Sequence, residues 1–362
     1  MRTILENLLT KPLWMLEDLG FRLMLQPPQE RMTRRHWAEL DEAGVRGIRV
    51  QDLRGVLMQE EWRGLCGSAE TDPEAPDGWR ISLKALHADE ELSDSFDKLE
   101  RFGLAYRTRS AAFVLPEAVT AAQMDGDDAD ESTYLLRLTD GLLRTVGCAP
   151  LKEMAHMIDL RADLELNVSV QPVLPEWMTE RMARLWQLRM GMDGVRLVDG
   201  SEMWLVAEQC QDPTAVLRGQ LFGKGKDLKY PRFTARQVGE ISLRGNPVPW
   251  NKTEPVMRLL LTQGMSPAEA ERFLGHTAVL VQREQQGPAA QLLGEAIPDS
   301  PSPTRMRQIS DFYDSVPQWT LRGHSDAELN PSPLREKPHA RPDGLCSCGS
   351  GRPYVRCCGR LN

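Results

Sequence analysis

Hydrophobic residues recur at spacings of three and four through most of the chain, and this period predicts amphipathic α-helices. The first run, interrupted early by Pro12, consists of Leu5, Leu8, Leu9, Leu13, Leu16, Leu19 and Leu23. Similar runs continue from Thr133 to about Ile297. Within them, Ser266-Pro-Ala-Glu269 combines an N-cap serine, a first-turn proline and a capping-box glutamate, which together favour a helix start. The pattern therefore predicts a mainly α fold.

Residues 80–120 depart from this uniform helical pattern. A helical run that ends near Phe102 is followed by Gly103, which is suited to stop a helix because glycine adopts left-handed backbone angles without strain. The next stretch, LAYRTRSAAFVLP (104–116), alternates and turns midway, as a two-stranded hairpin would. Helix, helix, glycine stop and hairpin is the order of a winged helix. We therefore expect a winged-helix-like N-terminal unit with a small β-hairpin.

The helix that would enter DNA in such a unit is acidic. Against Lys98 and Arg101 it carries Asp89, Glu90, Glu91, Asp94, Asp97 and Glu100. A helix in the major groove has to neutralise phosphates, and this one would repel them. The charge pattern favours a winged-helix shape used for packing or protein contact. Arg107 and Arg109 in the hairpin keep a nucleic-acid interpretation open, because a wing can touch phosphate.

Two stretches have the composition of linkers. The run MDGDDADES at 124–132 is acidic and polar, and Pro298 to Pro342 is rich in proline and serine. Inside the second stretch, aromatic residues and a Ser-x-x-Glu pair predict a short ordered island at 310–329. We therefore expect five parts: an N-terminal helical, winged-helix-like domain at 1–120, an acidic linker at 121–132, a helical domain at 133–297, a Pro/Ser-rich linker at 298–342 and a C-terminal tail at 343–362.

Composition and charge narrow the class of protein. The chain has 362 residues, 41% hydrophobic and 27% charged, and no run of about 18 uninterrupted apolar residues that a membrane span requires. Charged residues also interrupt the N-terminus where a signal peptide would be apolar, so we expect a cytoplasmic protein. Basic residues number 16 against 21 acidic ones in 1–120, 9 against 17 in 121–220, and 19 against 14 in 221–362. A polyanion would therefore meet the C-terminal part first.

The most basic internal stretch is GQLFGKGKDLKYPRFTARQ at 219–237. It interleaves Phe222, Tyr230 and Phe233 with the basic residues Lys224, Lys226, Lys229, Arg232 and Arg236. Such a stretch can bind single-stranded nucleic acid, because its basic side chains contact phosphates and its aromatic rings stack on bases. The alternative interpretation is a solvated surface loop. The spacing does not match a phosphate-binding Walker A loop, because Gly225 follows Lys224 where serine or threonine is needed.

Four of the seven cysteines lie in the last 17 residues, at a C-x-C-x8-C-C spacing: Cys346, Cys348, Cys357 and Cys358. Zinc prefers four soft ligands in a tetrahedron, and two close pairs joined by the Gly-Ser-Gly turn can supply them. The spacing predicts one structural zinc, because four protein ligands leave no open position for a substrate. The alternatives are disulfides, which need an oxidising compartment, and free thiols.

The segment CSCGSGRPYVRCCG resembles the SEC-C motif, the zinc knuckle at the C-terminus of the preprotein-translocase motor ATPase SecA and of many other bacterial proteins. The usual form is close to CPCGSGKKYKKCCG. Here Ser347 replaces the first proline and the middle positions vary, but the four cysteines, the GSG turn and Gly359 are in place. In SecA the knuckle helps to dock SecB and the ribosome. The resemblance therefore implies a docking element at the tail, which is about a twentieth of the chain.

Motifs of common enzymes are absent from the sequence. There is no H-E-x-x-H, no G-x-S-x-G and no dinucleotide fingerprint. The histidines stand alone at His36, His87, His156, His276, His324 and His339. Because catalytic groups can also assemble from distant positions, this lowers the expectation of an enzyme without excluding one. We expect a non-enzymatic zinc-binding adaptor whose tail docks a protein partner. The alternative is a nucleic-acid-associated regulator that uses the hairpin and the 224–236 loop.

Overall fold

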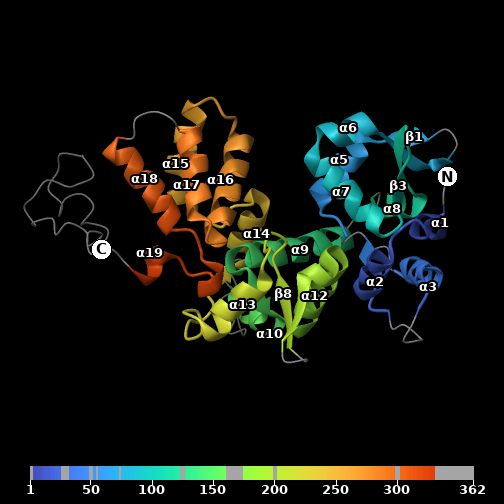
Figure 1. The fold of residues 1–362 in the computed structure, drawn as a ribbon, viewed down its shortest axis with the longest axis horizontal. Helices are drawn as coiled ribbons and strands as arrows, with labels where there is room; N and C mark the ends of the chain where they lie inside the picture. The colour runs from blue at the N-terminus through green and yellow to red at the C-terminus, as the bar shows by residue number, and fades with distance from the viewer. Residues whose placement is uncertain are drawn as a thin grey trace, which may run out of the picture.

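The computed structural model describes residues 3–25, 32–48, 52–53, 56–72, 75–122, 127–159, 174–198, 202–297 and 302–330. Most of these residues are helical and the strands form small, mainly antiparallel sheets, which confirms the prediction of a mainly α fold. The elements form three groups in a row along the long axis of the molecule (Figure 1). Each group encloses a hydrophobic core, here named the first, second and third core in chain order.

The N-terminal group combines helices with a four-stranded antiparallel sheet of order β1-β2-β4-β3. Its elements are α1 (Ile4–Leu8), α2 (Leu13–Arg22), α3 (Arg34–Gly47), α5 (Gln59–Ser68), β1 (Glu70–Asp72), β2 (Ala75–Ser82), α6 (Leu83–Ala88), α7 (Glu90–Arg101), β3 (Ala105–Arg107), β4 (Ala111–Val114) and α8 (Pro116–Ala122). The predicted hairpin near 104–115 is β3 and β4, with Tyr106 opposite Phe113 and their rings stacked. Gly103, at φ +70°, turns the chain from α7 into this hairpin, as expected.

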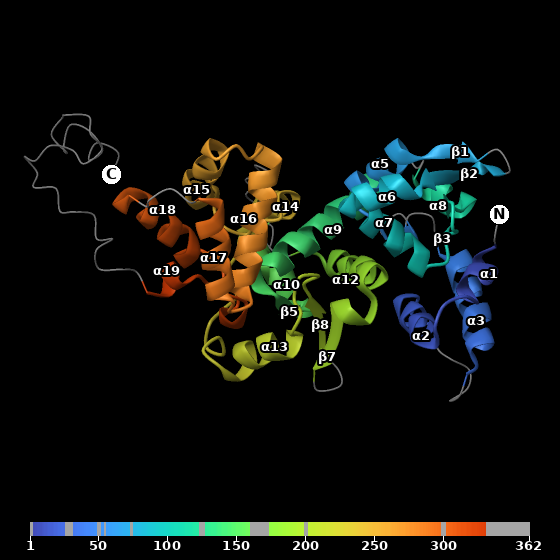
Figure 2. The same cartoon turned by 45° about the horizontal axis from the view of Figure 1, so that its top comes forward.

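The central group is built on a long helix that runs from the N-terminal group into the middle of the molecule (Figure 2). Its elements are α9 (Asp127–Val146), β5 (Cys148–Pro150), α10 (Leu151–Met157), β6 (Ile158–Asp159), α12 (Glu176–Met190), the 3-10 turn η1 (Gly191–Gly194), β7 (Val195–Val198), β8 (Glu202–Val206), α13 (Pro213–Phe222), β9 (Phe233–Thr234) and α14 (Ala235–Arg244). Helix α14 packs closely on α9 because Gly141 has no side chain: a Cβ there would lie 2.0 Å from the Val238 carbonyl oxygen.

The C-terminal group is a helical bundle followed by a short ordered segment. Its elements are α15 (Trp250–Thr262), α16 (Pro267–Gln282), α17 (Gln286–Ala296), α18 (Pro303–Asp314), the 3-10 turn η2 (Trp319–Leu321) and α19 (Asp326–Leu329). Capping boxes at Ser266 and Ser325 start α16 and α19, as the sequence predicts. The island expected at 310–329 is anchored in two cores, because Phe312 belongs to the third core and Trp319 to the second.

Three features differ from the expected layout. Helix α18 begins at Pro303, before the ordered island expected at 310–329 and inside the stretch expected to be a Pro/Ser-rich linker. Helix α9 begins at Asp127, inside the stretch expected to be an acidic linker, so the acidic residues there extend a helix. The strands β7 and β8 lie in a region expected to be helical, and they form a three-stranded antiparallel sheet with β5. Among the helices of the described residues, none has both the length and the apolar character that crossing a membrane requires.

Candidate functional site

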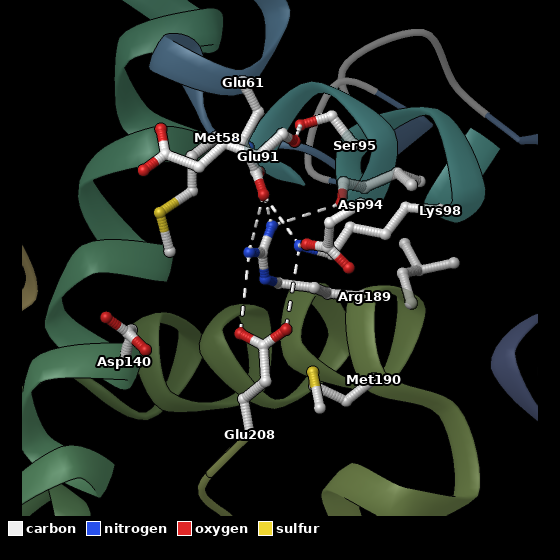
Figure 3. A network of polar contacts seen from close by, with 12 residues as sticks. Met58, Glu61, Glu91, Asp94, Ser95, Lys98, Asp140, Arg189, Met190 and Glu208 are labelled. Atoms are coloured by element: carbon white, nitrogen blue, oxygen red, sulfur yellow. Dashed lines mark hydrogen bonds and ion pairs between the residues drawn. The ribbon is translucent and has the colours of Figure 1, made fainter. Parts of the chain in front are cut away.

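A largely buried network of charged side chains lies where the N-terminal group meets the central group (Figure 3). We call it the ion-pair network. Its members are Glu61 on α5, Asp94 and Lys98 on α7, Arg189 in the last turn of α12, and Glu208 just after β8. Figure 3 shows Glu61 and Glu208 on opposite sides of the Arg189 guanidinium. The network therefore joins four segments that are distant in sequence.

Glu61 is the central acceptor of the network. Its Oε2 accepts from Arg189 Nη1 at 2.7 Å and its Oε1 from Arg189 Nη2 at 3.0 Å, which is the two-pronged geometry in which arginine binds a carboxylate most strongly. Lys98 Nζ donates to Oε1 at 2.7 Å. The backbone N–H of Met58 donates to Oε2 at 2.6 Å, so the same carboxylate also caps the start of α5.

The two cations have further carboxylate partners. Lys98 Nζ lies 2.6 Å from Asp94 Oδ2, one turn earlier on α7, and 3.7 Å from Glu208 Oε1. Arg189 Nη2 lies 3.8 Å from the other oxygen of Glu208. Three carboxylates thus surround two cations, and both cations are almost fully buried. Such a cluster is stable only while every charge keeps its partner.

The pKa values show that the network stays charged at neutral pH. Burial alone would raise the pKa of Glu61, but Arg189 and Lys98 outweigh it and hold this pKa at about 2. The same neighbours lower the pKa of Glu208 against the effect of burial. Burial would lower the pKa of Lys98, yet the three carboxylates raise it. A general acid or base has to exchange a proton near the working pH, so these groups are suited to hold the structure together rather than to transfer protons.

A second polar contact joins the same two groups. The buried Arg22 guanidinium, at the end of α2, donates to the backbone carbonyls of Leu188, Arg189 and Met190 and pairs with Asp18 at 2.7 Å. These carbonyls are at the end of α12, where no intrahelical donor reaches them. Arg22 therefore caps α12 from the neighbouring group, at the same helix end that carries Arg189 of the network.

The hairpin arginines differ in their surroundings. Arg107 lies over the Phe96 ring at 4.8 Å and pairs with Asp97 at 2.5 Å and Glu100 at 2.6 Å, all on α7. Its charge is therefore neutralised by the acidic helix, which explains why a basic residue stands there. Arg109 is exposed in the turn between β3 and β4. Of the two predicted phosphate contacts, only Arg109 points its charge into solvent.

The basic loop is organised differently from the sequence interpretation. The five predicted contacts are exposed, namely Lys224, Lys226, Lys229, Arg232 and Arg236, and Arg236 pairs with Glu240 on α14. Tyr230 donates its hydroxyl to Gln220 Oε1 at 2.8 Å and its ring is covered by Arg322, while Phe233 packs against the second core. Of the interleaved aromatics only Phe222 is exposed, so the loop is not a platform on which successive bases stack.

The predicted zinc ligands, Cys346, Cys348, Cys357 and Cys358, lie outside the described residues. Within those residues, no group of three or more His, Cys, Asp or Glu side chains is placed to hold a metal ion. Of the other three cysteines, Cys148 and Cys210 are buried and Cys66 is exposed.

Sequence analysis did not find the ion-pair network, because its members come from positions up to 147 residues apart. The local signals are the Asp94–Lys98 pair, four residues apart on α7, and the Met58–Glu61 start of α5, which identifies Glu61 as a capping residue and not as an ion-pair partner. Comparison with known proteins adds no relative: no protein family, no curated protein and no solved structure matches the chain.

Proposed function

We propose that this protein is a non-enzymatic adaptor: a rigid helical body that holds a protein partner and carries a zinc-binding docking element at its C-terminus. The observation that carries the proposal is the set of contacts that helix α7 makes within the protein. The segments α5, β2, α6, α7, β3 and β4 follow one another in the order of a winged helix, with β4 between β2 and β3 in the sheet. Helix α7 stands in the place of a DNA-reading helix.

The long sides of α7 are engaged by the rest of the protein. Leu92, Phe96 and Leu99 face the first core. On another side, Asp94 and Lys98 face α12 and the segment after β8, across a cavity of about 360 Å³. Asp97 and Glu100 pair with Arg107 of the hairpin. The residues at the start of α7 that remain exposed are acidic. A helix used in this way supports the winged-helix-like unit as a packing module and not as a reader of DNA.

The tail supplies the docking element of the proposal. Its support is the cysteine spacing and the resemblance to the SEC-C motif, which together favour one structural zinc bound by Cys346, Cys348, Cys357 and Cys358. Metal analysis of protein purified under reducing conditions without chelator is expected to give one zinc per chain, and none in the Cys357→Ser, Cys358→Ser double variant. Folded wild-type protein free of zinc would contradict this part.

A pull-down from native lysate tests the adaptor function. The full chain is compared with a chain truncated after Pro342 and with the double cysteine variant, each with and without nuclease. Protein partners that survive nuclease and disappear with both altered chains support the proposal. Partners that remain bound to both altered chains would show that the tail is not the docking element.

The second candidate is a nucleic-acid-associated regulator, which one observation favours. Lys224, Lys226, Lys229 and Arg232 are all exposed, and within the described residues no carboxylate pairs with any of them. Each of the three lysines can neutralise a phosphate and so release a counterion from a nucleic acid. Binding of a fluorescent single-stranded oligonucleotide that weakens steeply with salt, and that falls when these lysines are changed to glutamine, would support this candidate.

A further inference from the structure

A second cavity, lined by several charged side chains, lies in the central part of the molecule. It has a volume of about 320 Å³ and lies between α9, α14, α16 and the segment after β8. We call it the arginine pocket; its lining residues are Arg144, Gln209, Arg244, Gly245, Arg272, Gly275, His276, Val279 and Arg283. Four of them are arginines and none is a carboxylate, although the whole chain has a net charge of −8.

The ends of three helices bring the arginines together. Arg144 and Arg244 lie in the last turns of α9 and α14, and Arg283 follows the end of α16. Two glycines allow this approach. A Cβ on Gly275 would lie 2.7 Å from the Gly245 carbonyl oxygen, and Gly245 itself has φ +63° and leaves the space beside Arg144 open. The pocket is therefore formed by close contact of helix backbones.

Local structure accounts for two of the four arginines. A cation in the last turn of a helix is stabilised by the helix dipole, and each of these two also has one carboxylate. Arg144 pairs with Asp140 at 2.8 Å, and Arg244 pairs with Glu271 at 3.0 Å. Even so, Arg244 Nη2 is buried and has no hydrogen-bond partner among the described residues. One donor thus remains unused.

The other two arginines have no comparable explanation. Arg272 pairs with Glu91 at 3.4 Å, but the two side chains are 67% and 78% exposed, and such a surface pair contributes little. Arg283 donates through Nε and Nη2 to the backbone carbonyl of Gln209, at 3.0 and 2.5 Å, and no carboxylate in the described part of the chain pairs with it. Burial lowers the pKa of Arg283, as expected for a cation that lacks a nearby anion.

We propose that the arginine pocket binds the phosphate group of a small phosphorylated ligand. Guanidinium groups match phosphate geometrically and bind it through paired N–H donors. The pocket offers such donors from several helices, and of its lining residues Val279 alone has an aliphatic side chain, so it would recognise the phosphate and leave the rest of the ligand at the opening. This site is independent of the adaptor function proposed above.

The charge around the pocket favours a discrete phosphate over a polymer. Arg283 also borders a larger cavity, of about 770 Å³, which continues toward Lys224. That cavity is lined by Asp212, Glu284 and Asp326 as well. Beyond Arg283 the lining has one further cation, Lys224, against these three carboxylates, so a nucleic-acid strand leaving the pocket on this side would meet more negative than positive charge.

Calorimetric titration of the full chain tests the proposal, with pyrophosphate and inorganic phosphate as probes at constant ionic strength. Saturable binding is expected, tighter for pyrophosphate because it carries more charge. Changing Arg272 and Arg283 together to glutamine is expected to weaken binding about tenfold or more, the loss of one or two charge-assisted hydrogen bonds. Arg258→Gln is the matched control: Arg258 is an exposed α15 residue paired with Glu254, and its loss should leave binding unchanged.

Three results would overturn the proposal. The first is no saturable binding of either probe to the wild type. The second is equal weakening by the control variant, which would place the anion elsewhere. The third is a single-stranded oligonucleotide that binds more tightly than pyrophosphate and competes with it, which would make the ligand a polymer. If the double variant does not fold, the exposed Arg272→Glu variant replaces it, and its binding is expected to weaken as well.

Discussion

Replacing Glu61 by glutamine should destabilise the protein strongly, and the loss should depend on pH in a defined way. The amide keeps the size of the side chain but removes its charge, which leaves Lys98 and Arg189 buried with fewer anions. The fall of the Glu61 pKa from 4.5 to about 2 gives the scale. At about 1.4 kcal/mol per pKa unit it corresponds to roughly 3 kcal/mol. Removing one partner of a buried ion pair costs a similar amount, about 3–5 kcal/mol.

The sign of the pH dependence follows from the lowered pKa. Between pH 4.5 and 2 the unfolded chain takes up a proton at Glu61 while the folded chain does not, so this contribution is complete above about pH 5 and is lost as the pH falls. Urea unfolding followed by circular dichroism measures it. The difference between wild type and Glu61→Gln should be about 3 kcal/mol at pH 7 and about 1 kcal/mol at pH 3.

The adjacent residue provides the control. Glu60 lies on the same helix and pairs with Arg137 at 2.8 Å, but its side chain is 48% exposed. Glu60→Gln should therefore change the free energy of unfolding by no more than about 0.5 kcal/mol. Equal effects of the two substitutions, or a Glu61→Gln effect that stays constant from pH 7 to pH 3, would refute the view that Glu61 organises the network.

Three further predictions concern single side chains. Burial raises the pKa of Asp41 to about 8, so the folded protein keeps this carboxyl protonated at neutral pH. In urea titrations between pH 5 and 7, the wild type should therefore lose about 1.4 kcal/mol of stability per pH unit through this group, and the Asp41→Asn variant should not. Gly141→Ala should lower the free energy of unfolding by about 2 kcal/mol despite alanine's higher helix propensity, whereas Gly239→Ala, where a Cβ meets nothing within 4 Å, should raise it by about 0.5–1 kcal/mol. Trp319→Ala should cost about 3–5 kcal/mol and expose residues 315–330 to protease, and an uncut segment would contradict the anchoring role of this ring.

The features that the sequence predicts correctly are local ones. The capping serine and glutamate of α16 are three residues apart, and Gly103 acts on the backbone where it stands, so neither depends on the rest of the fold. The β7 and β8 strands are also local, although they were not predicted. The Asp199-Gly200 dipeptide between them in the sequence is a recognised hairpin signal. That signal was not used in predicting the stretch from Thr133 to about Ile297 to be mainly helical.

The features that could not be predicted depend on distant partners. The pairing of Glu61 with Arg189 spans 128 residues, and neither side chain differs from an ordinary surface charge in its sequence context. Tyr230 resembles a base-stacking residue until Gln220 and Arg322 are placed around it. Arg107 is an intermediate case, because the acids that neutralise it were visible in the sequence but their direction on α7 was not. Residue types and spacing do not specify such contacts.

The ion-pair network also has a consequence for the order in which the chain is made. Glu61 and Lys98 leave the ribosome long before Arg189 and Glu208, because 110 residues separate Lys98 from Glu208. At a synthesis rate of about 5–20 residues per second, the N-terminal group waits roughly 5–20 s for Arg189 and Glu208. During that interval Lys98 has only Glu61 and Asp94 as anionic partners within the network. The nascent N-terminal group is thus completed only when the central group has been synthesised and docks onto it.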